Sequence, residues 1–248
     1  MKPFVWSESF MVRAFESDSD GKATIAGLLN HMQEAAGNHA ELLNLAVYQL
    51  LPRHLTWVLS RIIVVMHRYP DYRERVRLET WPAGVDRFMA LRDYELFDAA
   101  ERIIASVRTQ WVMVDLHTMR PVALPPEVHQ IAAANTRFAL PLETARVARL
   151  DGNGAFHKDV QVRRSDIDLN RHVNNVHYLT WALESVPDEL AAGKRPMEVD
   201  LVFRHETRYG DALRCLAAPV DGQPGRFQHR IDRLGDGKDV FLALTTWR

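Results

Sequence analysis

The amino-acid sequence predicts an α+β protein made of two tandem units, each a helix packed against an antiparallel sheet. A run of apolar residues at helical spacing precedes segments that alternate apolar and polar side chains, and the same order of elements returns after a proline-rich segment. The chain has 248 residues, of which 47% are hydrophobic. It is therefore long enough for two cores of about 120 residues each, with every helix burying its apolar stripe against a sheet.

The first unit is predicted to contain a strand and then one long, largely buried helix between Thr24 and Leu45. Ile25, Leu28 and Met32 belong to its apolar stripe, and Thr24 is placed to cap the first turn. The four segments that follow alternate with period two and are rich in Val, Ile, Thr and Trp, which is typical of strands. They are Leu55–Met66, Arg75–Trp81, Leu91–Phe97 and Ile103–Asp115.

The segment from Leu124 to Gly154 loses this regularity and predicts a crossing linker. It contains Pro125, Pro126 and Pro141 and ends in the turn signal Asp-Gly-Asn-Gly. The expected organisation is a first domain over residues 1–125, a linker over 126–154 and a second domain over 155–248.

The second unit repeats the predicted order of strand, helix and four strands. A strand over Phe156–Arg163 precedes a shorter helix over Asn174–Val186, which stops before Pro187. The remaining strands are expected at Met197–Glu206, Asp211–Val220, Gly225–Arg233 and Lys238–Trp247. A loose echo, Tyr-Arg-Glu-Arg-Val-Arg from Tyr72 and Tyr-Gly-Asp-Ala-Leu-Arg from Tyr209, supports duplication.

Composition argues against several classes of function. Lys plus Arg (31) nearly cancels Asp plus Glu (32), so no net field would gather nucleic acid. The single Cys215 cannot form an intrachain disulfide or a CxxC motif, which suits a reducing compartment, and no stretch reads as a signal peptide or membrane span. Glycine-rich phosphate loops, dinucleotide fingerprints, GxSxG elbows and metal motifs are also missing from the sequence. We expect a cytoplasmic protein with no cofactor, metal, nucleic acid or membrane partner.

The densest polar stretch, Ser-Asp-Ile-Asp-Leu-Asn-Arg-His-Val-Asn-Asn-Val-His-Tyr from Ser165, lies directly before the second helix. One interpretation is helix capping, for which Asn174 or Asn175 would suffice. The other concerns Asp168, Asn170 and His172, because residues two apart in an extended segment point to the same side. A carboxylate, an amide and an imidazole beside a helix amino terminus suit the hydrolysis of an activated carbonyl.

The same stretch, from Asp166 to Pro187, resembles the signature of plant and bacterial acyl-acyl-carrier-protein (acyl-ACP) thioesterases. The likeness runs through nearly the whole chain. Further matching segments are Leu29–His39, Thr56–Arg61, Arg68–Pro70 and Trp111–Asp115. The resemblance implies a tandem (double) hotdog fold, in which the first hotdog binds the acyl chain and the second carries the catalytic residues.

The resemblance also implies a catalytic set of Asp168, Asn170, His172 and a downstream carboxylate, Glu206. Plant relatives commonly have a cysteine after that glutamate, and here the position is Thr207. We therefore expect water rather than a protein thiol to attack a thioester. The first unit's equivalent loop, residues 16–24, has carboxylates but no Asn-x-His and is not expected to be a second active site.

The implied reaction releases fatty acid from acyl-ACP, with acyl carrier protein as partner and a homodimer as the expected assembly. An acidic carrier would dock on local cations, for which Arg163, Arg164, Arg171, Lys194 and Arg195 are candidates, although a solvated surface explains them equally well. Three alternatives stay open: a hotdog acyl-CoA thioesterase, a hydratase, or a non-catalytic acyl-binding module. Acyl chain length is not determined by the sequence.

Overall fold

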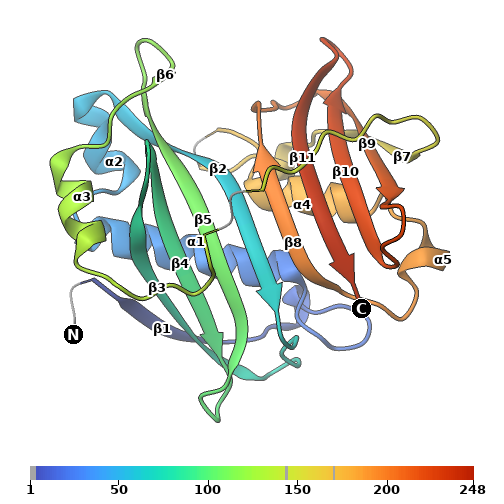
Figure 1. The fold of residues 1–248 in the computed structure, drawn as a ribbon, viewed down its shortest axis with the longest axis horizontal. Helices are drawn as coiled ribbons and strands as arrows, with labels where there is room; N and C mark the ends of the chain where they lie inside the picture. The colour runs from blue at the N-terminus through green and yellow to red at the C-terminus, as the bar shows by residue number, and fades with distance from the viewer. Residues whose placement is uncertain (1–3, 143–144, 170) are drawn as a thin grey trace. The chain divides into compact units, whose positions relative to one another are not determined.

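The computed structural model describes residues 4–142, 145–169 and 171–248, and its contacts divide the chain into two compact units between residues 143 and 144. This division falls inside the segment that the sequence predicts as a linker. Each unit contains one main helix and one antiparallel sheet, as predicted (Figure 1). Within the described residues, no helix has the length and apolar character needed to cross a membrane.

The first unit has a sheet with strand order β1-β3-β4-β5-β2, and a short β6 pairs with β5. Figure 1 shows α1, drawn in blue, lying across one face of this sheet. The strands are β1 (Trp6–Met11), β2 (Leu55–Met66), β3 (Arg75–Asp86), β4 (Met89–Phe97), β5 (Ile103–Asp115) and β6 (Arg120–Pro121). The helices are α1 (Ile25–Leu42), α2 (Val47–Leu50) and α3 (Pro126–Ala133), with short 3₁₀ turns η1 (Ala14–Glu16) and η2 (Leu51–Arg53).

Helix α1 begins where its cap was predicted. The Thr24 hydroxyl oxygen accepts a hydrogen bond from the Gly27 backbone N–H at 3.1 Å, which satisfies one of the free donors of the first turn. The helix ends at Leu42, and Asn44 then takes the left-handed conformation that commonly follows a helix, with φ of 59°. The predicted apolar stripe is buried, including Leu28 and Met32.

Two features of the first unit differ from the expectation. Strand β3 runs to Asp86 rather than Trp81, because a register shift between Pro82 and Gly84 lets pairing with β4 continue past the proline. The predicted linker also contains α3, whose Val128 is buried in a cluster with Leu50, Met113 and other apolar residues. A proline opens this helix, where no N–H is needed, so the proline-rich signal marked a helix start.

The segment after α3 covers one face of the first sheet through a buried ion pair. Arg108 and Asp93 are 1% and 0% exposed and are joined by two hydrogen bonds of 2.7 Å. Asp93 also accepts the Ala139 backbone N–H at 2.8 Å, and Arg108 donates to the Pro141 carbonyl at 2.8 Å. A buried pair that is fully hydrogen-bonded is costly to break. This part of the chain is therefore built into the first unit.

The second unit repeats the strand order of the first, as β7-β9-β10-β11-β8. Figure 1 shows α4 lying across one face of this second sheet. The strands are β7 (Phe156–Gln161), β8 (Pro196–Phe203), β9 (Ala212–Pro219), β10 (Arg226–Arg233) and β11 (Lys238–Trp247). The helices are α4 (Asn175–Leu183) and α5 (Asp188–Ala191), and the 3₁₀ turn η3 spans Arg164–Asp166.

The loose sequence echo between the halves corresponds to one shared structural feature. Val12 donates to the Glu74 carbonyl at 3.0 Å and accepts from the Arg73 N–H at 3.0 Å. In the second unit, Val162 makes the same two contacts with Asp211 at 2.9 Å and Gly210 at 3.0 Å. The predicted duplication is thus present in the hydrogen bonds as well as in the strand order.

Candidate active site

The segment that carries Asp168 and His172 is a tight turn between η3 and α4. The Asp168 N–H donates to the His172 carbonyl at 2.8 Å, and the Arg171 N–H donates to the Asp168 carbonyl at 3.0 Å. Arg171 takes a left-handed φ of 62°. The assumption that this segment is extended was therefore wrong, because aspartate readily hydrogen-bonds its own loop and favours a turn. Here an Asp168 carboxylate oxygen accepts the His172 N–H at 3.4 Å.

Both ends of this turn are anchored. The buried Asp166 carboxylate accepts the Arg163 backbone N–H at 2.7 Å, and the Asp166 carbonyl accepts the Asn174 N–H at 2.9 Å. The Asn174 side chain in turn accepts the Val176 N–H at 3.1 Å and caps α4. The capping interpretation is thus confirmed for Asn174, and the cap connects the turn to the helix.

Glu206 lies in the loop after β8, because that strand ends at Phe203 rather than at the predicted Glu206. Its neighbour Thr207 is fully buried and is bound by the Tyr178 hydroxyl group of α4. The two hydroxyl oxygens are 2.7 Å apart, and the Thr207 N–H donates to the Tyr178 oxygen at 3.0 Å. Burial raises the pKa of Tyr178, so the phenol stays neutral. Arg233 holds the Glu206 carbonyl from β10 at 2.8 Å.

These anchors bring His172 and Glu206 together. His172 Nε2 lies 3.1 Å from Glu206 Oε2, and the two side chains are 55% and 41% exposed. The other carboxylate oxygen, Oε1, accepts a hydrogen bond from Arg208 at 3.0 Å. An imidazole paired with a carboxylate and open to water can accept a proton from a water molecule and return it.

The structure brings some of the predicted site residues into contact but not all of them. His172 and Glu206 are in contact, and Asp168 shapes the turn through the His172 backbone. Asn170 lies outside the described residues. Sequence reasoning missed the anchoring role of Tyr178 and Thr207. An aromatic residue on the apolar face of a helix usually belongs to a core, so no local signal could have indicated it.

The predicted docking cations fall into two groups. Arg164 opens the 3₁₀ turn η3 that precedes the active-site turn, and its guanidinium lies 4.6 Å from the ring centre of Tyr209. Arg195 directly precedes β8, whereas Glu206 follows the other end of that strand. Eight strand residues span roughly 26 Å, so Lys194 and Arg195 do not share a surface with the Arg164 group.

Cys215 lies on β9 in the core and is fully buried. Burial raises the pKa of its thiol to about 12, so the reactive thiolate is not formed near neutral pH. This agrees with the expectation that the chain does not use a cysteine nucleophile.

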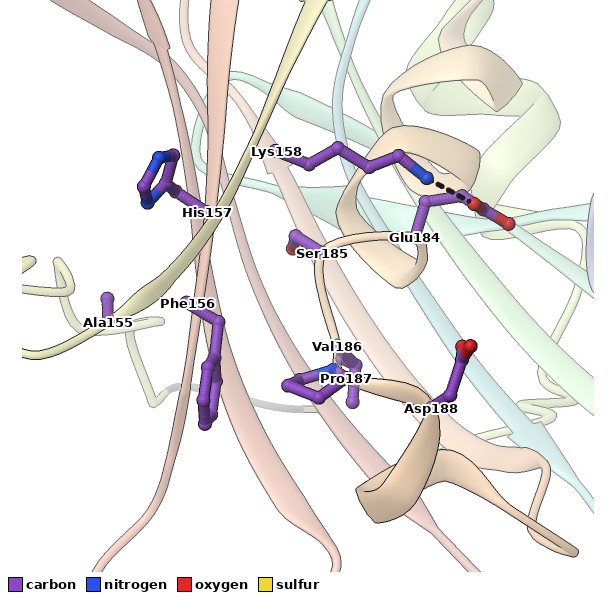
Figure 2. A pocket seen from close by; sticks show the side chains of 9 residues that line it. All are labelled: Ala155, Phe156, His157, Lys158, Glu184, Ser185, Val186, Pro187 and Asp188. Carbon is purple, nitrogen blue, oxygen red and sulfur yellow. Dashed lines mark hydrogen bonds and ion pairs between the residues drawn. The ribbon is translucent and has the colours of Figure 1, made fainter.

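An open recess of about 510 Å³ lies at the opposite end of α4 from the His172–Glu206 pair (Figure 2). Figure 2 shows its most prominent polar contact, a 2.7 Å ion pair between Lys158 and Glu184. Both side chains are more than half exposed, at 51% and 60%. An exposed ion pair of this kind carries little energy, and none of the predicted site residues lines this recess, so we place the candidate chemistry at the His172–Glu206 pair instead.

Comparisons with known proteins show the family of the chain. Residues 3–132 match the family model of the acyl-ACP thioesterase N-terminal domain, and residues 151–248 match that of the C-terminal domain. A palmitoyl-acyl carrier protein thioesterase of Cuphea hookeriana, a chloroplastic protein, is 30% identical over 98% of this chain, which spans 62% of that relative's length.

Two solved structures are similar over nearly their whole length. A 12:0-ACP thioesterase from Umbellularia californica has a TM-score of 0.88 at 26% identity, covering 98% of this chain and 97% of that one. An acyl-ACP thioesterase from Bacteroides thetaiotaomicron has a TM-score of 0.87 at 26% identity, with 98% of each chain covered. The double hotdog fold implied by the resemblance is therefore confirmed. The chain belongs to the acyl-ACP thioesterase family.

Proposed function

We propose that this chain hydrolyses fatty acyl-ACP thioesters to free fatty acid and carrier protein. The observation that carries the proposal is the 3.1 Å contact between His172 and Glu206 in a chain of this family, with both side chains open to water. The pair supplies a base for water, and the amino terminus of α4 lies directly after the turn that holds His172.

In the proposed reaction, water attacks the thioester carbonyl carbon while its proton passes to the His172–Glu206 pair. The oxygen that becomes negative is stabilised by the amino-terminal end of α4 and by Asn170, which is assigned to this role from its place in the sequence. The C–S bond then breaks, and the proton passes from the pair to the departing sulfur. Asp168 keeps His172 in place through the turn.

The first hotdog is proposed to hold the acyl chain and the second to perform the hydrolysis. Support comes from the family match to both halves and from the matching positions of the two turns, where the first has a lysine paired with a carboxylate and the second has an imidazole paired with one. Related proteins are named for palmitoyl and 12:0 substrates, so family membership leaves the chain length open. We further propose a cytoplasmic location and a homodimer, which rest on the sequence alone.

The proposal is tested by measuring fatty acid release from ACP thioesters of graded acyl length, with matched CoA thioesters in parallel. We expect turnover with ACP substrates to exceed that with CoA substrates. Single-turnover reactions in ¹⁸O-water should place one label in the fatty acid without accumulation of an acyl-enzyme. Turnover confined to CoA thioesters, hydration of enoyl substrates, or acyl binding without turnover would each favour one of the alternatives named above.

A further inference from the structure

Arg171 lies in the active-site turn at a position whose backbone conformation favours glycine. Its φ of 62° is left-handed, a region that side chains other than Gly, Asn and Asp rarely adopt. The turn before α1 shows the alternative. Gly21 has a φ of 71° and donates to the Asp18 carbonyl at 3.0 Å, the same contact that Arg171 makes with Asp168. The turn therefore forms without an arginine.

The Arg171 side chain is exposed, and among the described residues it has no ion-pair or hydrogen-bond partner. Two neighbouring cations do have partners within the chain. Arg208 donates to Glu206 at 3.0 Å, and Arg164 lies over the ring of Tyr209 at 4.6 Å. Arg171 is thus a guanidinium of the active-site turn that is available to a ligand.

We propose that Arg171 binds an anionic oxygen group on the carrier side of the thioester and so strengthens substrate binding beside the His172–Glu206 pair. A guanidinium presents a planar set of donors that fits the two oxygens of a phosphate or carboxylate. The inference rests on the proposed function, because it presumes a carrier-bound substrate. Two parts of that substrate can supply the anion: the phosphodiester of its phosphopantetheine arm and the carboxylates of the carrier protein.

The experiment compares Arg171→Gly and Arg171→Lys with the wild-type chain on three substrates that share one acyl chain. The acyl group is attached to acyl carrier protein, to 4′-phosphopantetheine, or to pantetheine, which lacks the phosphate. We expect Arg171→Gly to raise KM roughly tenfold for the first two substrates, with kcat and the KM for the pantetheine substrate unchanged. Arg171→Lys should recover part of the loss, because it keeps the charge without the planar donor set.

Arg73→Gly is the matched control. Arg73 is also exposed and left-handed, with φ of 66°, and its counterpart in the second unit is Gly210, with φ of 87°. Both glycine variants relieve the same backbone conformation, so both should unfold at an equal or higher temperature than the wild type. Only Arg171→Gly should change KM.

The outcomes separate the possibilities. A rise in KM for the ACP substrate alone identifies carrier carboxylates as the anion, and a rise for both phosphate-bearing substrates identifies the arm. An unchanged KM for all three overturns the inference, as does an equal loss of kcat on all three accompanied by a lower unfolding temperature. If the wild-type chain hydrolyses none of the thioesters, the proposed function itself fails, and that result cannot be confused with the others.

Discussion

The turn before α1 and the turn before α4 share one backbone design and differ in what their side chains can do. Asp18 and Asp168 each donate to the carbonyl four residues later at 2.8 Å, and each carboxylate accepts the N–H of that same residue. That residue is Lys22 in the first turn and His172 in the second. Each meets a carboxylate from a distant loop, Asp71 at 2.7 Å and Glu206 at 3.1 Å respectively.

A lysine ammonium group holds its proton at neutral pH, whereas an imidazole gains and loses one there. The first turn therefore forms a static surface ion pair, while the second forms a pair that can transfer a proton. In the mechanism that we propose, the hotdog scaffold supplies the position, and one side chain at this position determines whether a proton can be transferred there. Changes to each turn can test this view.

The largest effect is expected from making the second turn resemble the first. His172→Lys keeps a cation opposite Glu206 but removes the group that accepts a proton, so fatty acid release should fall about 10²- to 10⁴-fold. Glu206→Gln should show a loss in the same range. The control is Lys22→His, which should leave turnover within about threefold. Activity of His172→Lys within tenfold of wild type, measured on acyl-ACP, would contradict the comparison.

A loss of stability in acid is expected from the core of the second unit. His229 on β10 is fully buried beside Thr245, and burial lowers its pKa to about 4 from an ordinary value of 6.5. As the pH falls, His229 takes up a proton in the unfolded chain before it does so in the folded chain. The contribution of neutral His229 to the free energy of unfolding is therefore fully present above pH 6.5. It is lost as the pH falls from 6.5 to 4, by at most about 3 kcal/mol.

His229→Gln can keep a hydrogen bond to Thr245 without titrating, so its unfolding temperature should fall less than that of the wild type between pH 7 and pH 4.5. Thermal unfolding at a series of pH values provides the measurement. Parallel curves for the two proteins would show that His229 does not carry the acid sensitivity.

The anchor of Glu206 gives a prediction of intermediate size. Tyr178→Phe removes the hydroxyl group that binds buried Thr207, so stability should fall by about 2 kcal/mol, and kcat should fall as Glu206 loses its fixed place. Tyr94→Phe in the first unit is the control, because Tyr94 is also buried and also hydrogen-bonds a threonine, Thr109. Denaturant unfolding should report a similar loss for both, with a lower kcat for Tyr178→Phe alone.

The smallest effect is expected at Cys215. Since burial raises the pKa of its thiol to about 12, Cys215→Ala should keep turnover within twofold and reduce stability by about 1 kcal/mol. Iodoacetamide should not inactivate the native chain. Rapid inactivation that Cys215→Ala abolishes would mean that the second unit has a nucleophile besides water.

Local pattern predicted much of the fold. Thr24 caps α1 as expected, Leu55–Met66 and Lys238–Trp247 match β2 and β11 at both ends, and the duplicated order of elements appears in both sheets. These features depend on near neighbours in the chain, through the 3.6- and 2-residue periods and the demands of a free helix end. Helix α3 was missed because its prolines resemble those of a loop.

By itself the sequence determined the family signature and named Asp168, Asn170, His172 and Glu206 as the candidate set. Only the tertiary structure decided how members of that set meet. The turn at Asp168 replaces the extended segment that was assumed, and the hydrogen bonds between Tyr178 and Thr207 hold Glu206 against His172. The reason is physical: a periodic pattern reports which face of an element is buried, whereas the contact between two loops depends on the buried polar groups that fasten them.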